Sequence, residues 1–540
     1  MPSGTQKMQK AAVDLDAVVV GAGFAGLYML YRLRQLGLSA VVFETGDGVG
    51  GTWYWNAYPG ARCDVESLQY SFSFSEDLQQ EWEWTERYAS QPEIQRYLDH
   101  VADRFDLRKD IRLSTTVTAA RYDEKEKRWI VETDRGDRVR SRFCIMATGC
   151  LSAARIPDLE GLESFAGRVF HTGRWPRGKV SFSGRRVGVI GTGSSGIQAI
   201  AAIAPEAAAL TVFQRTPNFS IPAWNARLPP DRQAAFKAAY GSNRETARNT
   251  RSGILYDYAQ RGTFEVSEEE RQKEYEARWA KGGANFTHCF NDVFFDQAAN
   301  DLAADFVRAK IAAIVRDPEI ARTLMPTDHA IGTKRICVDT DYYATFNRPN
   351  VRLVDLRTSP IKRVDATGIR TSAAHHDLDD IVFATGYDAV TGALARIDIR
   401  GRGGERLTEK WHGGPRAYLG LMMAGFPNLF VITGPGSPSI LTNVVVSIEQ
   451  HVEWIGRCVE ELGRRGATEI EPLPDAEEGW VAHVAEVAGR TLFVQTNSWY
   501  MGANIPGKPR VFLPYVGGFQ NYTRICEEVV ERGYEGFAIA

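Results

Sequence analysis

Two stretches of the chain show the same order of hydrophobic patterns: an apolar run, a turn, helical periodicity and a second apolar run. The first, DAVVVGAGFAGLYMLYRLRQLGLSAVVFE, has apolar residues at 17–20 and 40–43, with Leu27, Leu30 and Leu33 at helical spacing between them. The second, GRRVGVIGTGSSGIQAIAAIAPEAAALTVFQRTP, predicts strands at 187–190 and 210–213. Each stretch therefore predicts a β-α-β unit within an α/β fold.

Each unit carries the spacing GxGxxG at its first turn, formed by Gly21, Gly23 and Gly26 and again by Gly191, Gly193 and Gly196. The first glycine permits a tight turn, the second lets the backbone approach a pyrophosphate, and the third lets helix pack on strand. The helix N-terminus then offers free N–H groups and the positive end of its dipole to phosphates. We expect two Rossmann-like dinucleotide sites; the alternative is two glycine turns that bind nothing.

The two units differ in the residue that follows their second strand. Glu44 ends the first unit, where a carboxylate can accept hydrogen bonds from ribose hydroxyls but would repel a 2′-phosphate. That choice suits FAD or NAD. Arg215 follows Gln214 at the end of the second unit, and its planar guanidinium matches the oxygens of a 2′-phosphate. The second site is therefore predicted to prefer NADPH.

Two further apolar runs end in Ala-Thr-Gly, at 143–149 and at 380–388, and suggest that the two dinucleotide domains are interleaved. The region between is helical in pattern: Ser267 and Glu270 form a capping box before one helix, and AANDLAADFVRAKIAAIV continues at 3.6-residue spacing. The predicted parts are an FAD-binding domain at 1–140 and 385–540, an NADP-binding domain at 150–220 and 330–384, and a helical insertion at 221–329.

Composition narrows the class of protein. With 540 residues, 44% hydrophobic and 24% charged, the chain is an ordinary multidomain globular protein, and its net charge of −3 gives no reason to expect nucleic acid binding. The seven cysteines are scattered, without CxxC or zinc spacing, so we expect no metal and a reduced compartment. The polar start MPSGTQKMQKAAVDLD lacks a signal peptide's apolar core, and no run of eighteen apolar residues occurs. We expect a cytoplasmic protein without a membrane span.

Two longer motifs then point to a family. FAGRVFHTGRWP has Phe165, Gly167, His171, Trp175 and Pro176 in the spacing FxGxxxHxxxWP, directly before the second dinucleotide unit. A lone histidine in such a stretch most often belongs to a surface loop. GGTWYWNAYPGARCD, at 50–64, is a second match. With these motifs the chain resembles the type I flavin-dependent Baeyer–Villiger monooxygenases, most of all the phenylacetone and steroid monooxygenase branch. The resemblance continues through IGTKR, GPGSPS and SWYMGANIPGKPRVF and covers nearly the whole chain.

The resemblance implies a reaction and its cofactors. NADPH reduces FAD, O₂ adds to the flavin, and an anionic C4a-peroxyflavin attacks a ketone carbonyl to give an ester or lactone. Sulfoxidation is expected as a side activity, and the chain is expected to act as a monomer. A fixed positive charge must stabilise the anionic species, and arginine provides one that does not titrate at pH 7.

The resemblance also assigns residues. Arg335 is the implied catalytic cation, and Asp64 is the carboxylate that orients it. Without the resemblance, the pair Lys334-Arg335 would predict only a solvent-exposed turn. His171 is implied to couple the movements of the two domains. The implied FAD contacts are Gly21, Gly23, Phe24, Ala25, Gly26, Glu44, Gly51, Thr52, Trp53, Asp64, Tyr70 and Val117. The implied NADP contacts are Thr192, Gly193, Ser194, Ser195, Gly196, Gln198, Arg215, Thr216, Lys334, Arg335 and Trp499. The implied substrate pocket is Ser439, Ile440, Leu441, Thr442 and Val444.

Three alternatives remain at the level of sequence. An N-hydroxylating or sulfur-oxidising flavin monooxygenase shares both dinucleotide folds but lacks the FxGxxxHxxxWP stretch in this form. A disulfide reductase would need a redox cysteine pair near the first glycine motif, where Cys63 stands alone. A non-catalytic NADPH-binding redox sensor or structural protein is the third.

Overall fold

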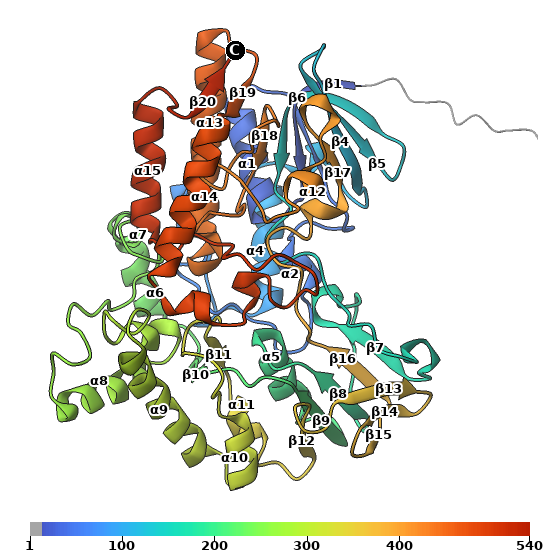
Figure 1. The fold of residues 1–540 in the computed structure, drawn as a ribbon, viewed down its shortest axis with the longest axis vertical. Helices are drawn as coiled ribbons and strands as arrows, with labels where there is room; N and C mark the ends of the chain where they lie inside the picture. Colours follow the sequence, from blue (N-terminus) through green and yellow to red (C-terminus); the bar gives the residue numbers. More distant parts are fainter. Residues whose placement is uncertain (1–12) are drawn as a thin grey trace, which may run out of the picture.

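The computed structural model describes residues 13–540 and contains two main sheets, a mixed sheet that lies above an all-parallel sheet in Figure 1. Residues 1–12, which hold most of the polar start of the chain, lie outside the described residues. Within 13–540, no helix combines the length and hydropathy needed to cross a bilayer. The upper sheet has eight strands in the order β17-β4-β5-β6-β1-β2-β3, with β18 also paired to β6.

Strands of the upper sheet come from both ends of the chain. They are β1 (Val13–Val20), β2 (Ala40–Phe43), β3 (Ile111–Arg112), β4 (Val117–Asp123), β5 (Arg128–Thr133), β6 (Arg138–Met146), β17 (Asp398–Arg400) and β18 (Leu429–Val431). The helices of this part are α1 (Phe24–Gln35), α2 (Thr52–Trp55), α3 (Glu76–Glu81), α4 (Gln91–Arg104), α12 (Leu407–Lys410), α13 (Val444–Arg465), α14 (Pro474–Gly489) and α15 (Phe519–Glu531). A small antiparallel pair, β19 (Ile470–Pro472) with β20 (Phe537–Ile539), lies beside α13.

The lower sheet has five strands in the order β12-β9-β8-β16-β7. They are β7 (Arg168–His171), β8 (Arg186–Ile190), β9 (Ala209–Gln214), β12 (Val351–Asp355) and β16 (Asp380–Phe383), with α5 (Ser194–Ile203) and α11 (Tyr342–Thr345) packed alongside. A three-stranded antiparallel sheet adjoins it, formed by β13 (Ile361–Asp365), β14 (Gly368–Thr371) and β15 (His375–Asp377).

A glycine permits the close packing of helix on strand in both dinucleotide units. A Cβ on Gly26 in α1 would lie 1.8 Å from the carbonyl oxygen of Gly21, and one on Gly196 in α5 would lie 2.2 Å from that of Gly191. Both distances are far below contact, so the third glycine of each motif is required where the helix crosses its strand. The two units share the same local construction.

The helical insertion follows the second unit. Its helices are α6 (Pro230–Ala238), α7 (Tyr240–Arg248), α8 (Glu268–Lys281), α9 (Gln297–Ile314) and α10 (Pro318–Leu324). The capping box predicted at Ser267 and Glu270 is confirmed at the start of α8. The insertion is closed by β10 (Ser220–Pro222) pairing in parallel with β11 (Cys337–Asp339), which brings the two ends of the inserted segment together.

The two chain segments that cross between the upper and lower sheets are hydrogen-bonded to each other. Arg155 N donates to Gly386 O at 3.1 Å, Asp388 N to Ala153 O at 2.9 Å and Val390 N to Cys150 O at 2.7 Å. Ala154 and Tyr387 form an antiparallel bridge in the same stretch. We call residues 150–155 with 386–390 the crossover ribbon.

The α/β fold with two interleaved Rossmann-like units and a helical insertion is confirmed by these sheets and crossings. β6 continues to Met146, which pairs with Val20, six residues past position 140, where the first part of the FAD-binding domain is predicted to end. The strand is longer because its last residues, 143–146, are buried in the middle of the sheet. The domain boundaries remain predictions.

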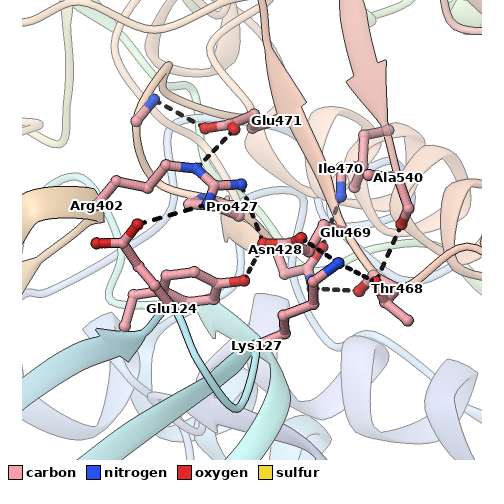
Figure 2. A network of polar contacts seen from close by, with 12 residues as sticks. Glu124, Lys127, Arg402, Pro427, Asn428, Thr468, Glu469, Ile470, Glu471 and Ala540 are labelled. Atoms are coloured by element: carbon pink, nitrogen blue, oxygen red, sulfur yellow. Dashed lines mark hydrogen bonds and ion pairs between the residues drawn. The ribbon is translucent and has the colours of Figure 1, made fainter.

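A buried carboxylate fixes the outer edge of the upper sheet. Glu469 is 5% exposed, and its oxygens accept from Lys127 Nζ at 2.8 Å and Arg402 Nη2 at 3.0 Å, with Tyr122 as a third donor (Figure 2). Arg402 also contacts Glu471 at 2.8 Å. Burial acts to raise the pKa of Glu469, but hydrogen bonds from Lys127 and Tyr122 outweigh it and hold the pKa below its ordinary value.

We expect Glu469→Gln to lower the free energy of unfolding at pH 7 by roughly 1–3 kcal/mol, because two cations lose their shared partner. Because the folded pKa is depressed, this stabilisation is present above the unfolded pKa of about 4.3 and is lost as pH falls through the folded pKa. Urea unfolding of wild type and variant at pH 7 and near pH 4 measures the loss of unfolding free energy and its dependence on pH. The exposed Glu83→Gln is the control, and an equal loss of stability in both variants would contradict the role of the network.

Candidate functional site

A cavity of about 1330 Å³ lies between the two dinucleotide units and is lined by both. Most of the predicted site residues meet there, although they come from segments spread over the whole chain. Those in the lining are Gly21, Gly23, Phe24, Ala25, Glu44, Gly51, Thr52, Trp53, Asp64, Tyr70, Val117, Thr192, Gly193, Ser194, Ser195, Gln198, Arg215, Thr216, Lys334, Arg335, Ser439, Ile440, Thr442, Val444 and Trp499. Gly26 and Gly196 lie outside it, packed on their strands, and Leu441 and His171 lie elsewhere.

The end of the cavity at the first unit fits a dinucleotide pyrophosphate. Gly23 precedes α1, and no side chain caps the first turn of that helix. A Cβ on Gly51 would lie 2.9 Å from the Cα of Gly23, so a side chain there would fill the cradle beside the helix. Uncapped N–H groups and a close backbone approach are what an FAD pyrophosphate requires.

Glu44 is held at the end of β2. Its two carboxylate oxygens accept from Ala22 N at 2.8 Å and Gly46 N at 2.7 Å, and the residue is 5% exposed. Burial raises the pKa of this carboxyl, and the backbone hydrogen bonds partly oppose that effect. The side chain is oriented by its own loop and lies in the cavity lining, where it could also meet ribose hydroxyls.

The opposite end of the cavity collects positive charge beside the second unit. No side chain caps α5, which begins after Gly193. Arg215 is exposed after β9, and Lys334 is largely buried with its Nζ 4.0 Å from Asp328 Oδ2. Burial lowers the pKa of Lys334, Asp328 raises it, and nearby Arg215 lowers it further. Arg215 and Lys334 repel each other, and a phosphate bound between them would remove that repulsion. This arrangement fits the 2′-phosphate of NADP.

Arg335 and Asp64 form a bidentate ion pair in the wall of the cavity. Arg335 Nε donates to Asp64 Oδ2 at 2.6 Å and Nη2 to Oδ1 at 2.8 Å, while Nη1 donates to the carbonyl of Ile440 at 2.9 Å. Burial raises the pKa of Asp64, but Arg335 outweighs it and holds the pKa below its ordinary value. The guanidinium remains a fixed positive charge, about a third exposed, toward the cavities.

The predicted pocket segment is divided between two cavities. Ser439, Ile440, Thr442 and Val444 line the large cavity, whereas Leu441 lines a smaller one of about 120 Å³. The smaller cavity, which we call the second cavity, also includes Asp64 and Arg335, so the ion pair forms part of the wall of both. Apolar Phe294, Phe493 and Leu441 give it a largely hydrophobic lining.

His171 lies outside the cavity at the end of β7. Its Nδ1 accepts from Gly173 N at 2.9 Å, so its Nε2 carries the proton and donates to the carbonyl of Arg155 at 3.1 Å. Arg155 belongs to the crossover ribbon and its guanidinium donates to the carbonyl of Asn504, close to Trp499. His171 therefore reaches the cavity indirectly, through the ribbon.

The aromatic residues and glycines around His171 are explained by packing. Trp175 stacks on Phe170 with ring centres 5.0 Å apart, and the backbone N–H of Trp175 donates to the backbone carbonyl of Trp55 at 3.1 Å. A Cβ on Gly173 would lie 2.6 Å from the ring of Tyr387, so close approach to the crossover ribbon requires a glycine there. Phe165 packs in a separate apolar cluster with Ile190 and Phe213.

Sequence reasoning missed several residues of the large cavity. The most prominent are polar or charged side chains from scattered positions, namely Asn56, Tyr58, Arg62, Arg155, Arg396, Tyr387, Asn504 and Arg510. Tyr58 had a signal, because it lies within the second family motif, and its hydroxyl donates to Gln198 at 2.8 Å across the two domains. Arg62 lies within the same motif and Arg510 within SWYMGANIPGKPRVF, whereas Arg155 and Arg396 lie outside every quoted motif.

Comparison with known proteins also indicates a nucleotide-binding oxidoreductase. Residues 18–290 match the family model described as pyridine nucleotide-disulphide oxidoreductase. All seven cysteines lie in the described residues and none of them is paired in a disulfide there, and burial raises the pKa of the Cys63 thiol.

Three similar proteins cover nearly the whole chain. A structure of oxidised steroid monooxygenase bound to NADP is 53% identical, with a TM-score of 0.94 over 98% of this chain and 99% of that one. Acetone monooxygenase (methyl acetate-forming) of Gordonia sp. (strain TY-5) is 42% identical over 98% of this chain and all of its own length. Phenazine N-monooxygenase PhzNO1 of Lysobacter antibioticus is 44% identical over 97% of each chain.

Each of these three matches covers 97% or more of this chain, so each spans both dinucleotide units. The chain belongs to the flavin-dependent Baeyer–Villiger monooxygenases, which bind FAD and use NADPH.

Proposed function

We propose that the protein inserts one atom of O₂ beside the carbonyl of a ketone, giving an ester or lactone, with NADPH as the electron donor. Ketone, O₂, NADPH and a proton yield ester, water and NADP⁺, so atoms and electrons balance. The observation that carries the proposal is the bidentate Arg335–Asp64 pair in the wall of a cavity lined by both dinucleotide units. When bound, FAD takes hydride from NADPH and activates O₂.

The protein residues supply charge and position. Arg335 is oriented by two hydrogen bonds to Asp64 and one to the Ile440 carbonyl, so its free surface faces the cavities in one fixed direction. A preorganised cation stabilises negative charge on oxygen without the reorganisation that water would need. Trp499 and the apolar lining limit the access of water to the same region. Arg335 is the proposed catalytic residue and Asp64 the residue that orients it.

The proposed cofactor positions follow from the two ends of the large cavity. FAD would be held by the loop and helix start at Gly21–Gly26, by Gly51–Trp53 and by Glu44, and NADP by the start of α5 with Arg215 and Lys334. The proposed FAD positions belong mainly to the predicted FAD-binding domain, and the proposed NADP positions belong to the predicted NADP-binding domain. The proposed assembly is a monomer in the cytoplasm, with sulfoxidation as a side activity.

N-oxidation is a second candidate function, because one relative of 44% identity is named a phenazine N-monooxygenase. Product analysis with a panel of ketones, a phenazine and a thioether, each with NADPH and O₂, separates the two. Ester formation supports the first proposal, and N-oxide formed without any ester supports the second.

The role of Arg335 can be tested by removing its charge. Arg335→Ala is expected to bind FAD and to oxidise NADPH, yet to lose ester formation by roughly 10²–10³-fold, because the preorganised cation is gone. Arg335→Lys should recover only part of the activity, since an ammonium cannot make the bidentate contact with Asp64. Asp64→Ala should show a smaller loss. Ester formation by Arg335→Ala at a near-normal rate would refute the assignment.

The coenzyme preference predicts a selective effect. Arg215→Ala should raise the KM for NADPH and leave the KM for NADH nearly unchanged, because only NADPH carries the 2′-phosphate. Steady-state kinetics with both coenzymes measures it. Arg348→Ala removes an exposed arginine of the same domain outside the cavity lining and serves as the control. Equal changes for both coenzymes in Arg215→Ala would count against a phosphate contact.

The His171 contact predicts a coupling effect without loss of the fold. His171→Ala removes the donor to the Arg155 carbonyl, so the variant is expected to keep FAD absorbance and melting behaviour while its turnover falls or its KM for NADPH rises. Comparison of kcat and KM with bound flavin content checks this. Wild-type kinetics would show that His171 has only a packing role.

A further inference from the structure

The second cavity contains a cation that the proposed reaction does not use. Arg251 lines this cavity together with Asp64, Arg335, Tyr256, His288 and Leu441. It comes from the helical insertion, just after α7, whereas Arg335 comes from the other side of the inserted segment. The folding of the insertion against the upper sheet therefore brings two guanidinium groups to the same small cavity.

Arg251 has no carboxylate partner among residues 13–540. Its Nη2 is 3.4 Å from the carbonyl of Val516, and its guanidinium carbon lies 4.9 Å from the ring centre of Phe295. Nearby Arg248, by contrast, lies 3.8 Å from Glu449. Burial lowers the pKa of Arg251, so its charge is partly desolvated and uncompensated. A half-buried cation of this kind gains from an anionic partner.

The charge balance of the second cavity is positive. Its lining includes two guanidiniums, Arg251 and Arg335, against one carboxylate, Asp64. His288 does not add charge, because burial, with smaller contributions from Arg251 and Arg278, lowers its pKa to about 3. Burial keeps the pKa of Tyr256 well above its ordinary value, so this phenol is neutral. Asp64 neutralises the charge of Arg335, whereas no carboxylate in the lining of the second cavity neutralises the charge of Arg251.

We infer that Arg251 is a specificity-determining residue that binds the carboxylate of an anionic ketone whose carbonyl lies at Arg335. The inference rests on the proposed function. The apolar lining from Phe294, Phe493 and Leu441 would contact the carbon chain between the two polar groups. A planar carboxylate matches the guanidinium fork, and the resulting charge-assisted hydrogen bonds are stronger than neutral ones. The substrate class is therefore keto acids.

The test compares each keto acid with its own methyl ester, which differs in the anionic charge and one methyl group. A series from 4-oxopentanoate to 8-oxononanoate is paired with the methyl esters, and oxygenated product is measured with the FAD-containing enzyme. Wild type should favour the acid, in kcat/KM, for at least one chain length. In Arg251→Gln that acid-to-ester ratio should fall roughly 10- to 100-fold, as expected for loss of a charged hydrogen bond.

Two further variants and one condition complete the test. Arg251→Lys keeps the charge and should retain part of the preference. Arg261→Gln removes an exposed arginine of the same insertion, 64% exposed, and should leave the ratio unchanged. In wild type, the preference should weaken at high ionic strength, because salt screens a partly exposed charge. The salt dependence is measured on the wild-type enzyme, so it tests the inference even if Arg251→Gln fails to fold.

The outcomes separate this inference from the proposed function. Conversion of the neutral esters without any preference for acids, or an unchanged ratio in Arg251→Gln, would overturn the role of Arg251 alone. Failure to oxygenate any ketone, acid or ester would overturn the proposed function as well. A preference for acids that disappears in Arg251→Gln and survives in Arg261→Gln would establish Arg251 as the residue that binds the substrate carboxylate.

Discussion

The ion pair between Arg335 and Asp64 constrains more of this protein than any other single contact. The two residues are 271 positions apart, and they reach each other only when the segment after α2, the return from the insertion and the pocket segment at Ile440 are all in place. Taking two charges out of water is costly, and only close bidentate geometry offsets that cost. The position of the active-site cation therefore depends on the correct docking of both dinucleotide units.

The features that sequence predicted well are those with a local physical cause. Gly26 and Gly196 must be glycines because a helix crosses a strand a few residues away, and Glu44 and Arg215 reach the cavity lining because of their offset within the same units, while their cofactor contacts remain predictions. Ser267 and Glu270 form a capping box within one turn of helix. In each case the pattern and its cause lie within one short segment, so the spacing alone was sufficient.

The features that local sequence patterns do not reveal depend on distant segments. Arg335 is one half of an ordinary Lys-Arg pair, and resemblance to a family, not its pattern, identified it. The carbonyl of Ile440 orients it through the backbone, which no side-chain pattern reveals. Arg155 and Arg251 lie outside every recognised motif and reach the cavities only through the crossover ribbon and the insertion. Likewise, no sequence pattern indicates that Leu441 lines the second cavity while Ser439 and Ile440 line the large one and Thr442 lines both.

The crossover ribbon has a mechanical consequence for the movement of the two sheets. A single connecting strand could bend and twist freely, whereas 150–155 and 386–390 are tied by three backbone hydrogen bonds. Two strands joined edge to edge resist stretching and resist bending within their plane, but they flex readily across it. The paired ribbon therefore restricts relative movement of the two sheets more than a single connection would, and His171 is hydrogen-bonded to it at the Arg155 carbonyl.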